Sequence, residues 1–186
     1  MVKVSETLRG PRDALSEARA VLRAQFYLRS ATEVAKTVRL HGKPFVRNLG
    51  TMIVRDRALL MSVVATLELA SGPNGTIDIG ERVFLNHGCS LGADLLVKIG
   101  PRCQIGPHCM LMDNDFHRLE PDRRMERPDS RPIVLEENVW LGARVIVLRG
   151  VTIGAGSVIG AGSVVATDIP ERVLAMGVPA RVIRSV

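Results

Sequence analysis

From Leu135 onward the chain places an aliphatic residue at every sixth position, and this spacing limits the fold more than any other feature of the sequence. The series is Leu135, Leu141, Val147, Ile153, Ile159 and Val165. Four residues after each comes another small or apolar residue: Val139, Val145, Val151, Ser157, Ser163 and Ile169. Neither a helix, with period 3.6, nor an ordinary strand, with period 2, produces a strict six. A short strand followed by a corner does, so the repeat predicts an all-β fold, a parallel β-helix of hexapeptides.

The same repeat occurs earlier in the chain, with one irregularity. Ile79, Leu85 and Leu91 are six apart, and after a gap of eight the series resumes with Ile99, Ile105 and Leu111. We therefore expect two extra residues near Leu96 and Val97 to bulge at a corner.

The repeat is absent between Leu111 and Leu135. Residues 112–131 contain eleven charged residues of both signs and two prolines. Unpaired charge is too costly to bury inside a coil, so this stretch is predicted to leave the coil as a long excursion loop, residues 112–132. Long loops in compact domains are usually functional or disordered, and we interpret this one as functional because it interrupts a regular solenoid.

Composition agrees with a narrow aliphatic interior, since aromatic residues make up only 3% of the chain. Cys89, Cys103 and Cys109 each stand four residues after a repeat aliphatic, which predicts small inward-facing side chains rather than metal ligands. We expect Cys89 and Cys109 to stack on adjacent coils in reduced form. The odd number of cysteines, and a start without a secretory leader, favour the cytoplasm.

The positive charge belongs to the N-terminal third. Residues 1–57 hold twelve Lys/Arg and five Asp/Glu, whereas residues 58–186 hold thirteen and fourteen. Residues 12 to about 29 have the pattern of an amphipathic helix. Its expected basic face is Arg12, Ser16, Arg19 and Arg23, and its expected apolar face is Ala14, Ala18, Val21, Leu22 and Leu28.

This pattern divides the chain into a basic helical segment, residues 1–33, and a β-helix domain with a turn-rich tail, residues 34–186. We expect the first coils of this domain, up to about Gly72, to be irregular. One interpretation is that the helix packs on the coil and leaves a solvated basic edge. The other is that it contacts the inner face of an anionic membrane, or a lipid-linked substrate. The segment lacks an aromatic stacking platform, so we expect no nucleic acid partner.

Several motifs in residues 77–184 resemble one family. They are FLNHG at 84–88, DNDFH at 113–117, NVWLG at 138–142, GVTIG at 150–154, IGAGSVV at 159–165 and GVPARVIR at 177–184. Together they resemble the hexapeptide-repeat acyltransferases, and within them the sugar O-acetyltransferases that include galactoside, maltose and nodulation acetyltransferases. The N-terminal third is more similar to enzymes that acetylate bacterial surface polysaccharides. The resemblance implies a left-handed coil, a homotrimer with the acceptor site between subunits, and acetyl-CoA as co-substrate without a metal.

Transfer of an acyl group from a thioester to a hydroxyl needs a base near the hydroxyl and a donor for the developing oxyanion. His117 is the candidate base, because imidazole can take and return a proton near neutral pH and because DNDFH matches the family's catalytic segment. A surface histidine in a charged loop is the alternative. Asn86 matches the family's active-site asparagine, which meets the acceptor hydroxyl or the histidine across a subunit boundary.

Four further residues are candidates for the acceptor side of the site. Asp113 and Asp115 precede His117 and either fix its tautomer or are solvated loop acids. His87 has no counterpart in the family's motifs and is expected to line the same cleft. Trp140 lies between two inward residues, so it should point outward, as a platform for a sugar ring or as a subunit contact.

The carrier contacts follow from the resemblance alone. The backbone N–H near Gly142 and Ala143 matches the group that holds the thioester carbonyl, and one coil edge matches the path of the pantetheine arm. The residues of that edge are Ala161, Ala166 and Thr167, and the cations expected near the CoA phosphates are Arg181 and Arg184. The family often has Lys at the position of Thr167, so one phosphate contact differs here.

The leading functional prediction is an acetyl-CoA-dependent O-acetyltransferase acting on a sugar hydroxyl, in a surface polysaccharide or its precursor. An antibiotic or xenobiotic acetyltransferase and a non-catalytic β-helix scaffold are the alternatives. A γ-class carbonic anhydrase is disfavoured, because His108 and His117 do not have the spacing of its zinc ligands.

Overall fold

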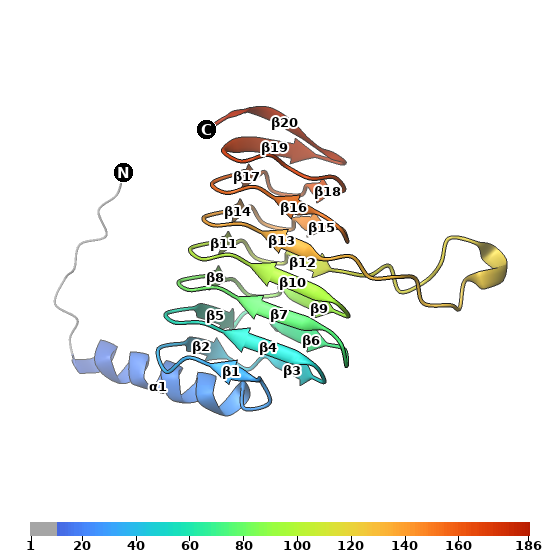
Figure 1. Ribbon diagram of the computed structural model, residues 1–186. Coiled ribbons are helices and arrows are strands. Elements are labelled where there is room, and N and C mark those ends of the chain that lie inside the picture. The colour runs from blue at the N-terminus through green and yellow to red at the C-terminus, as the bar shows by residue number, and fades with distance from the viewer. Residues whose placement is uncertain (1–10) are drawn as a thin grey trace.

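Three sheets, parallel except for the final pair β19–β20, wind around a common axis in the computed structural model, which describes residues 11–186 (Figure 1). The first sheet holds β1 (Glu33–Val34), β4 (Thr51–Val54), β7 (Thr76–Ile79), β10 (Leu96–Ile99), β13 (Ile133–Leu135) and β16 (Thr152–Ile153). The second holds β2 (Arg39–Gly42), β5 (Leu59–Ser62), β8 (Phe84–Leu85), β11 (Gln104–Ile105), β14 (Trp140–Leu141), β17 (Val158–Ile159), β19 (Val173–Gly177) and β20 (Ala180–Ser185). The third holds β3 (Phe45–Asn48), β6 (Glu68–Ser71), β9 (Ser90–Ala93), β12 (Met110–Met112), β15 (Ile146–Val147) and β18 (Val164–Val165).

The six-residue repeat forms the interior of the coil, as predicted. Ile105, Leu141 and Ile159 are in register on β11, β14 and β17, and all three are fully buried. Within each strand the neighbouring side chains point outward, because successive residues of a strand face opposite sides of the sheet. One aliphatic residue per repeat therefore stacks on its counterpart in the next coil, and the chain buries a continuous apolar core.

The expectation of irregular coils up to Gly72 was wrong. Strands β1 to β6 belong to the same three sheets and pair in parallel with the later strands. Met52, Val54, Leu60 and Leu69 are fully buried. The inward–outward alternation is kept in each of these strands, but their corners differ in length, and this removes the six-residue period from the sequence.

The two extra residues in the earlier repeat, Ile79 to Leu111, lie slightly before the position that was expected. Leu96 and Val97, where the bulge was placed, are regular members of β10 and pair with Thr76 and Ile77 of β7. The additional length is taken up at the corner between β9 and β10, at Asp94 and Leu95.

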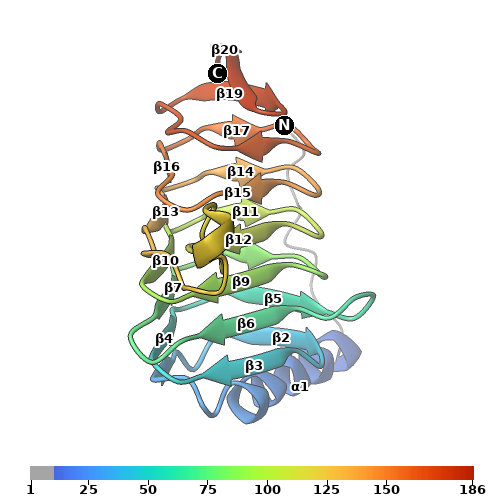
Figure 2. The same cartoon turned by 90° about the vertical axis from the view of Figure 1, so that its right-hand side faces the viewer.

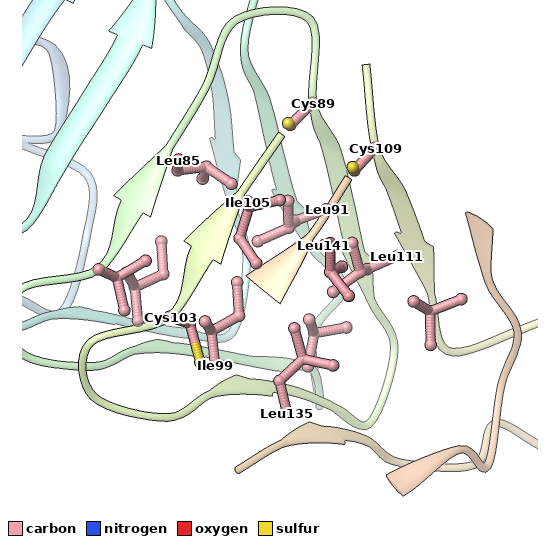
Figure 3. Close-up of a cluster of buried hydrophobic side chains, with 14 of the residues drawn as sticks. Leu85, Cys89, Leu91, Ile99, Cys103, Ile105, Cys109, Leu111, Leu135 and Leu141 are labelled. Atoms are coloured by element: carbon pink, nitrogen blue, oxygen red, sulfur yellow. The ribbon is translucent and has the colours of Figure 1, made fainter. Parts of the chain in front are cut away.

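The cysteines pack as predicted, and Figure 3 shows Cys89 beside Cys109 at one corner with Cys103 at another. The pairing of Ser90 with Met110 puts Cys89 and Cys109 in register on adjacent coils, which in a sheet lie about 4.8 Å apart. All three thiols are free and buried. The Cys89 thiol donates to the carbonyl oxygen of Gly106 at 3.1 Å, and the Cys109 thiol donates to that of Gly142 at 3.1 Å.

We expect all three thiols to react slowly with Ellman's reagent in the native protein at pH 8. Burial raises the pKa of Cys103 to about 11, and contact with the Cys109 thiol, together with burial, raises the pKa of Cys89. A raised pKa keeps Cys89 and Cys103 in the unreactive thiol form at pH 8. The hydrogen bond with the Cys89 thiol lowers the pKa of Cys109, so the slow reaction of Cys109 depends on its burial from the reagent. Three equivalents should titrate rapidly in guanidinium chloride, and fast reaction of the native protein would contradict this packing.

Helix α1 (Pro11–Tyr27) lies across the N-terminal end of the coil (Figures 1 and 2). Proline is favoured at the first helical position, where its missing N–H costs nothing. Ala20, Ala24 and Leu28 form the buried face against the coil. The expected apolar face was wrong for Leu22, which is 69% exposed, and Ala18 is exposed as well. The side chains of Arg12 and Ala14 lie outside the described part of the chain.

Among the residues described, no helix has the length and apolar character needed to cross a bilayer.

The excursion loop is confirmed between β12 and β13, at residues 113–132, with one short 3₁₀ helix, η1 (Pro121–Arg123). It projects far from the coil in Figure 1. Because it leaves from the C-terminal end of β12, the loop belongs to one particular edge of the third sheet.

Candidate functional site

The candidate residues occupy two edges of the third sheet. The chain enters this sheet from the second sheet at what we call the leading edge, the residues just before β9, β12, β15 and β18. It leaves toward the first sheet at the trailing edge, the residues just after these strands. Since all the strands are parallel, each edge is a column of corners that runs the length of the coil.

His117 lies on the excursion loop at the trailing edge, with an exposed side chain. Its Nδ1 lies 2.9 Å from the carbonyl oxygen of Arg124. A carbonyl oxygen can only accept a hydrogen bond, so the neutral imidazole must carry its proton on Nδ1. Nε2 then carries the lone pair, which is the state that a general base requires.

Asp113 is fully buried at the base of the loop. Its carboxylate accepts the backbone N–H groups of Asp94, Leu95 and Leu96 at 2.7–2.9 Å. These three N–H groups belong to the corner that contains the two extra residues. The Asp113 carboxylate therefore holds this corner to the loop, and the described hydrogen bond of the His117 ring goes to Arg124 rather than to Asp113.

Asp115 forms an ion pair with Arg149, which lies on the trailing edge one coil further along. The same guanidinium also donates to the carbonyl oxygen of Asp129 at 3.3 Å, so it ties both legs of the loop to the coil. Arg127 pairs with Asp94 at 3.2 Å and adds a third tie. Sequence reasoning missed Arg149 and the Arg124 carbonyl, because neither a turn arginine nor a backbone oxygen has a recognisable pattern.

The leading edge carries Asn86 and His87. Both are half-buried, and the Asn86 side-chain oxygen accepts the N–H of His87 at 2.8 Å. The His87 ring meets His108 of the next coil edge-to-face, with ring centroids 5.3 Å apart. Within residues 11–186 no cluster of three or more His, Cys, Asp or Glu could hold a metal ion.

Further along the leading edge, the backbone N–H groups of Gly142 and Ala143 differ in whether they have a hydrogen-bond acceptor. The N–H of Gly142 donates to the carbonyl oxygen of Ile159 at 2.8 Å, as part of the coil ladder. Among the described residues, no acceptor is found for the N–H of Ala143. Ala143, rather than Gly142, is therefore the free donor that could hold a thioester carbonyl.

The other expected carrier contacts do not share one edge, contrary to the sequence-based expectation. Ala161 lies on the leading edge beside Ala143, whose carbonyl oxygen accepts the N–H of Gly162 at 2.8 Å. Ala166 and Thr167 lie on the trailing edge, because β18 separates them from Ala161. Arg181 and Arg184 are exposed on β20, in the hairpin that closes the coil (Figure 1).

Trp140 points outward from β14, as expected, and is 55% exposed. Its register neighbours on the second sheet are Gln104 below and Val158 above. Because β14 leads directly into Gly142 and Ala143, the indole lies close to the leading edge.

The residues thus fall into two groups that a single chain does not bring together. His117 and Thr167 belong to the trailing edge, whereas Asn86, Ala143 and Ala161 belong to the leading edge. The whole width of the third sheet separates the two groups.

The hexapeptide model of bacterial transferases, six repeats, matches residues 132–167. A putative acetyltransferase of Schizosaccharomyces pombe is 36% identical over 145 residues, which cover 72% of this chain and 70% of the relative. The chain belongs to the hexapeptide-repeat acetyltransferases. Its coil is accordingly a left-handed parallel β-helix.

Named relatives and solved structures add detail on substrates. A galactoside O-acetyltransferase of Escherichia coli is 42% identical over 113 residues, covering 59% of this chain, and the chain spans only about half of that relative, 54%. A hexapeptide-repeat acetyltransferase of Vibrio cholerae, solved with acetyl-CoA, matches with 34% identity and a TM-score of 0.56 over 63% of this chain and 67% of that one. A polySia-specific acetyltransferase, NeuO, matches with 26% identity and a TM-score of 0.60 over 80% of this chain and 65% of that one.

Proposed function

We propose that this protein transfers an acetyl group from acetyl-CoA to a sugar hydroxyl of a surface polysaccharide or its precursor, with His117 as the general base. The observation that carries the proposal is the His117 ring, held through Nδ1 by the Arg124 carbonyl, while Nε2 has no hydrogen-bond partner among the described residues. The substrates in the names of the relatives, a galactoside and polySia, support a sugar acceptor.

The chemistry follows from this arrangement. Nε2 of His117 removes the proton of the acceptor hydroxyl while the hydroxyl oxygen attacks the thioester carbonyl. The negative charge that develops on the carbonyl oxygen is stabilised by a backbone donor, for which the N–H of Ala143 is the candidate. The C–S bond then breaks, and the CoA thiolate takes the proton back from the His117 imidazolium. The products are an O-acetyl sugar and free CoA.

A hollow of about 510 Å³ on the outer face of the third sheet is the candidate acceptor site. It lies beside the base of the loop, and Asn114, Phe116 and Arg127 of the loop contribute to its wall. Polar groups with an aromatic side chain suit a sugar, which offers hydroxyls at its rim and an apolar ring face.

The division of candidate residues between two edges supports a homotrimer with its sites between subunits. The trailing edge of one copy would supply His117, and the leading edge of the next copy would supply Asn86 and Ala143. A cyclic assembly repeats this contact three times.

We expect two inactive variants to complement each other. His117→Ala removes the contribution of the trailing edge, and Asn86→Ala removes that of the leading edge. When the two variants are refolded together in equal amounts, about a quarter of the sites should combine an intact His117 with an intact Asn86, and these sites should be active. The recovered turnover is measured against each variant refolded alone. Sedimentation should report a trimer throughout, and a fully active monomer would contradict the arrangement.

We expect Arg184→Ala to raise the KM for acetyl-CoA about three- to tenfold with little change in kcat. An exposed charged contact contributes roughly 0.6–1.4 kcal/mol to both the ground state and the transition state. Within residues 11–186 the one acceptor found for the Arg184 guanidinium is the neighbouring Ser185 carbonyl, which leaves donors for a phosphate. Arg172→Ala, at an exposed corner, is the matched control and should leave KM unchanged.

The function itself is tested by following thiol release from acetyl-CoA with a panel of galactosides, maltose, sialic acid polymers and lipid-linked glycans. Sugar-dependent release that disappears in His117→Ala supports the proposal. If thiol is released from acetyl-CoA only when small antibiotics are the acceptors, the result would favour acetylation of xenobiotics. A failure to bind CoA by calorimetry would favour a scaffold.

The cytoplasm is the proposed location. Three buried free thiols suit a reducing compartment.

A further inference from the structure

The N-terminal end of the coil has a composition unlike the rest of the molecule. Helix α1 covers this end and contacts β2 (Figure 2). Ala20 and Ala24 of the helix, and Leu28 directly after it, are buried. These three residues are four apart and define one face of the helix. The opposite face therefore points away from the body of the protein.

That outward face carries large apolar side chains. Leu15, Leu22 and Phe26 are 53%, 69% and 60% exposed. Their spacing of seven and four residues places them within one narrow stripe, directly opposite the buried face. Arg19 is exposed and flanks the stripe.

The same end is strongly basic. Residues 15–57 contain nine Lys/Arg and three Asp/Glu, whereas residues 58–186 contain thirteen and fourteen. Of the three acids, Glu17 is already engaged by Arg39 at 2.8 Å, and Asp56 accepts from Thr37 at 2.9 Å. The positive charge of the chain is therefore concentrated in this segment, and the ion pairs found there engage Arg39 with Glu17 and Arg55 with Asp78.

A hollow of about 400 Å³ opens between the end of α1 and the turn before β3. It is lined by Phe26, Tyr27, Arg29, Ser30, Lys43, Pro44 and Val46. Arg29 lies over the Phe26 ring at 4.8 Å, and no carboxylate lines the hollow. Arg29 and Lys43 thus form a pair of cations beside the apolar stripe.

We propose that this end of the coil docks on an anionic lipid bilayer, with Leu15, Leu22 and Phe26 entering the interface and Arg29 and Lys43 contacting lipid phosphates. A helix with an apolar stripe bordered by arginines lies in the headgroup region in this manner. Basic residues add attraction to anionic lipids. A second copy of the chain is disfavoured as the occupant, because it would bring two basic ends together. The excursion loop projects from the side of the coil (Figure 1), so docking leaves it free.

Flotation of the full-length protein with vesicles tests this. We expect binding to phosphatidylcholine vesicles that contain phosphatidylglycerol, weak binding to phosphatidylcholine alone, and release by high salt. The double variant Leu22→Gln/Phe26→Gln and the double variant Arg29→Gln/Lys43→Gln should each weaken binding about tenfold or more.

The matched control is Leu119→Gln/Met125→Gln, which alters two loop residues that are 87% and 88% exposed. This variant should bind vesicles like the parent protein. Circular dichroism and sedimentation of every variant show whether fold and assembly are retained. No binding to anionic vesicles at low salt, or binding that the Leu22/Phe26 variant retains, would overturn the proposal. If the parent protein self-associates without lipid through this end, and the Leu22/Phe26 variant does not, the stripe is a contact between copies of the chain instead.

Discussion

Replacing His117 by alanine is expected to lower kcat about 10²- to 10⁴-fold, the usual contribution of a positioned general base. The side chain is exposed on a loop and contributes nothing to the core, so the free energy of unfolding should change by less than about 0.5 kcal/mol. Affinity for acetyl-CoA should be retained, because His117 is not among the candidate carrier contacts. Acceptor-dependent thiol release measures the rate, and calorimetry measures CoA binding.

His108→Ala is the matched control for this experiment. His108 is also an exposed histidine at a corner of the coil, but it packs against His87 and has no place in the proposed reaction. Its loss should leave turnover near normal. If instead the His117 variant keeps near-normal turnover with a true acceptor, the base assignment fails and His87 becomes the candidate.

Replacing Asp113 by alanine is expected to destabilise the protein by about 3–5 kcal/mol, because three backbone donors lose their acceptor at a cost of about 1–3 kcal/mol each. The Asp113 carboxylate is fully buried and satisfies three backbone N–H groups of the Asp94–Leu96 corner. Without it, these donors lose their acceptor. Guanidinium denaturation measures the loss, and kcat should fall too, because Asp113 begins the loop that carries His117.

Two further variants separate this effect from a general loss of charge. Asp113→Asn keeps one oxygen acceptor but turns an amide N–H₂ toward backbone donors, so its destabilisation should be intermediate. Asp115→Ala breaks an exposed ion pair with Arg149 and should cost less than about 1 kcal/mol. An Asp113→Ala protein within 1 kcal/mol of the parent would show that water replaces the carboxylate at this corner.

The role of Asp113 shows what sequence reasoning about the site could reach. The charged stretch located the loop, because such a stretch cannot continue an apolar coil, and the resemblance of DNDFH to the family's catalytic segment supplied the candidate base. It did not distinguish Asp113 from Asp115, although one is buried in the coil and the other pairs with Arg149 on the surface. Both are acids two residues apart, and only the path of the backbone separates them.

The repeat pattern alone was enough to predict the coil from Ile77 to Ile169, its inward-facing residues, the stacking of Cys89 on Cys109 and the position of the excursion loop. Each of these follows from a local rule, the alternation of side chains along short strands repeated at a fixed length. The tertiary structure alone decided that residues 34–72 continue the same sheets, that Leu22 faces outward, and that His117 and Asn86 lie on opposite edges. These depend on corners of unequal length and on contacts between residues far apart in the chain, such as Asp113 with Asp94. A repeat specifies which side chains face inward, but the register between coils fixes which residues become neighbours.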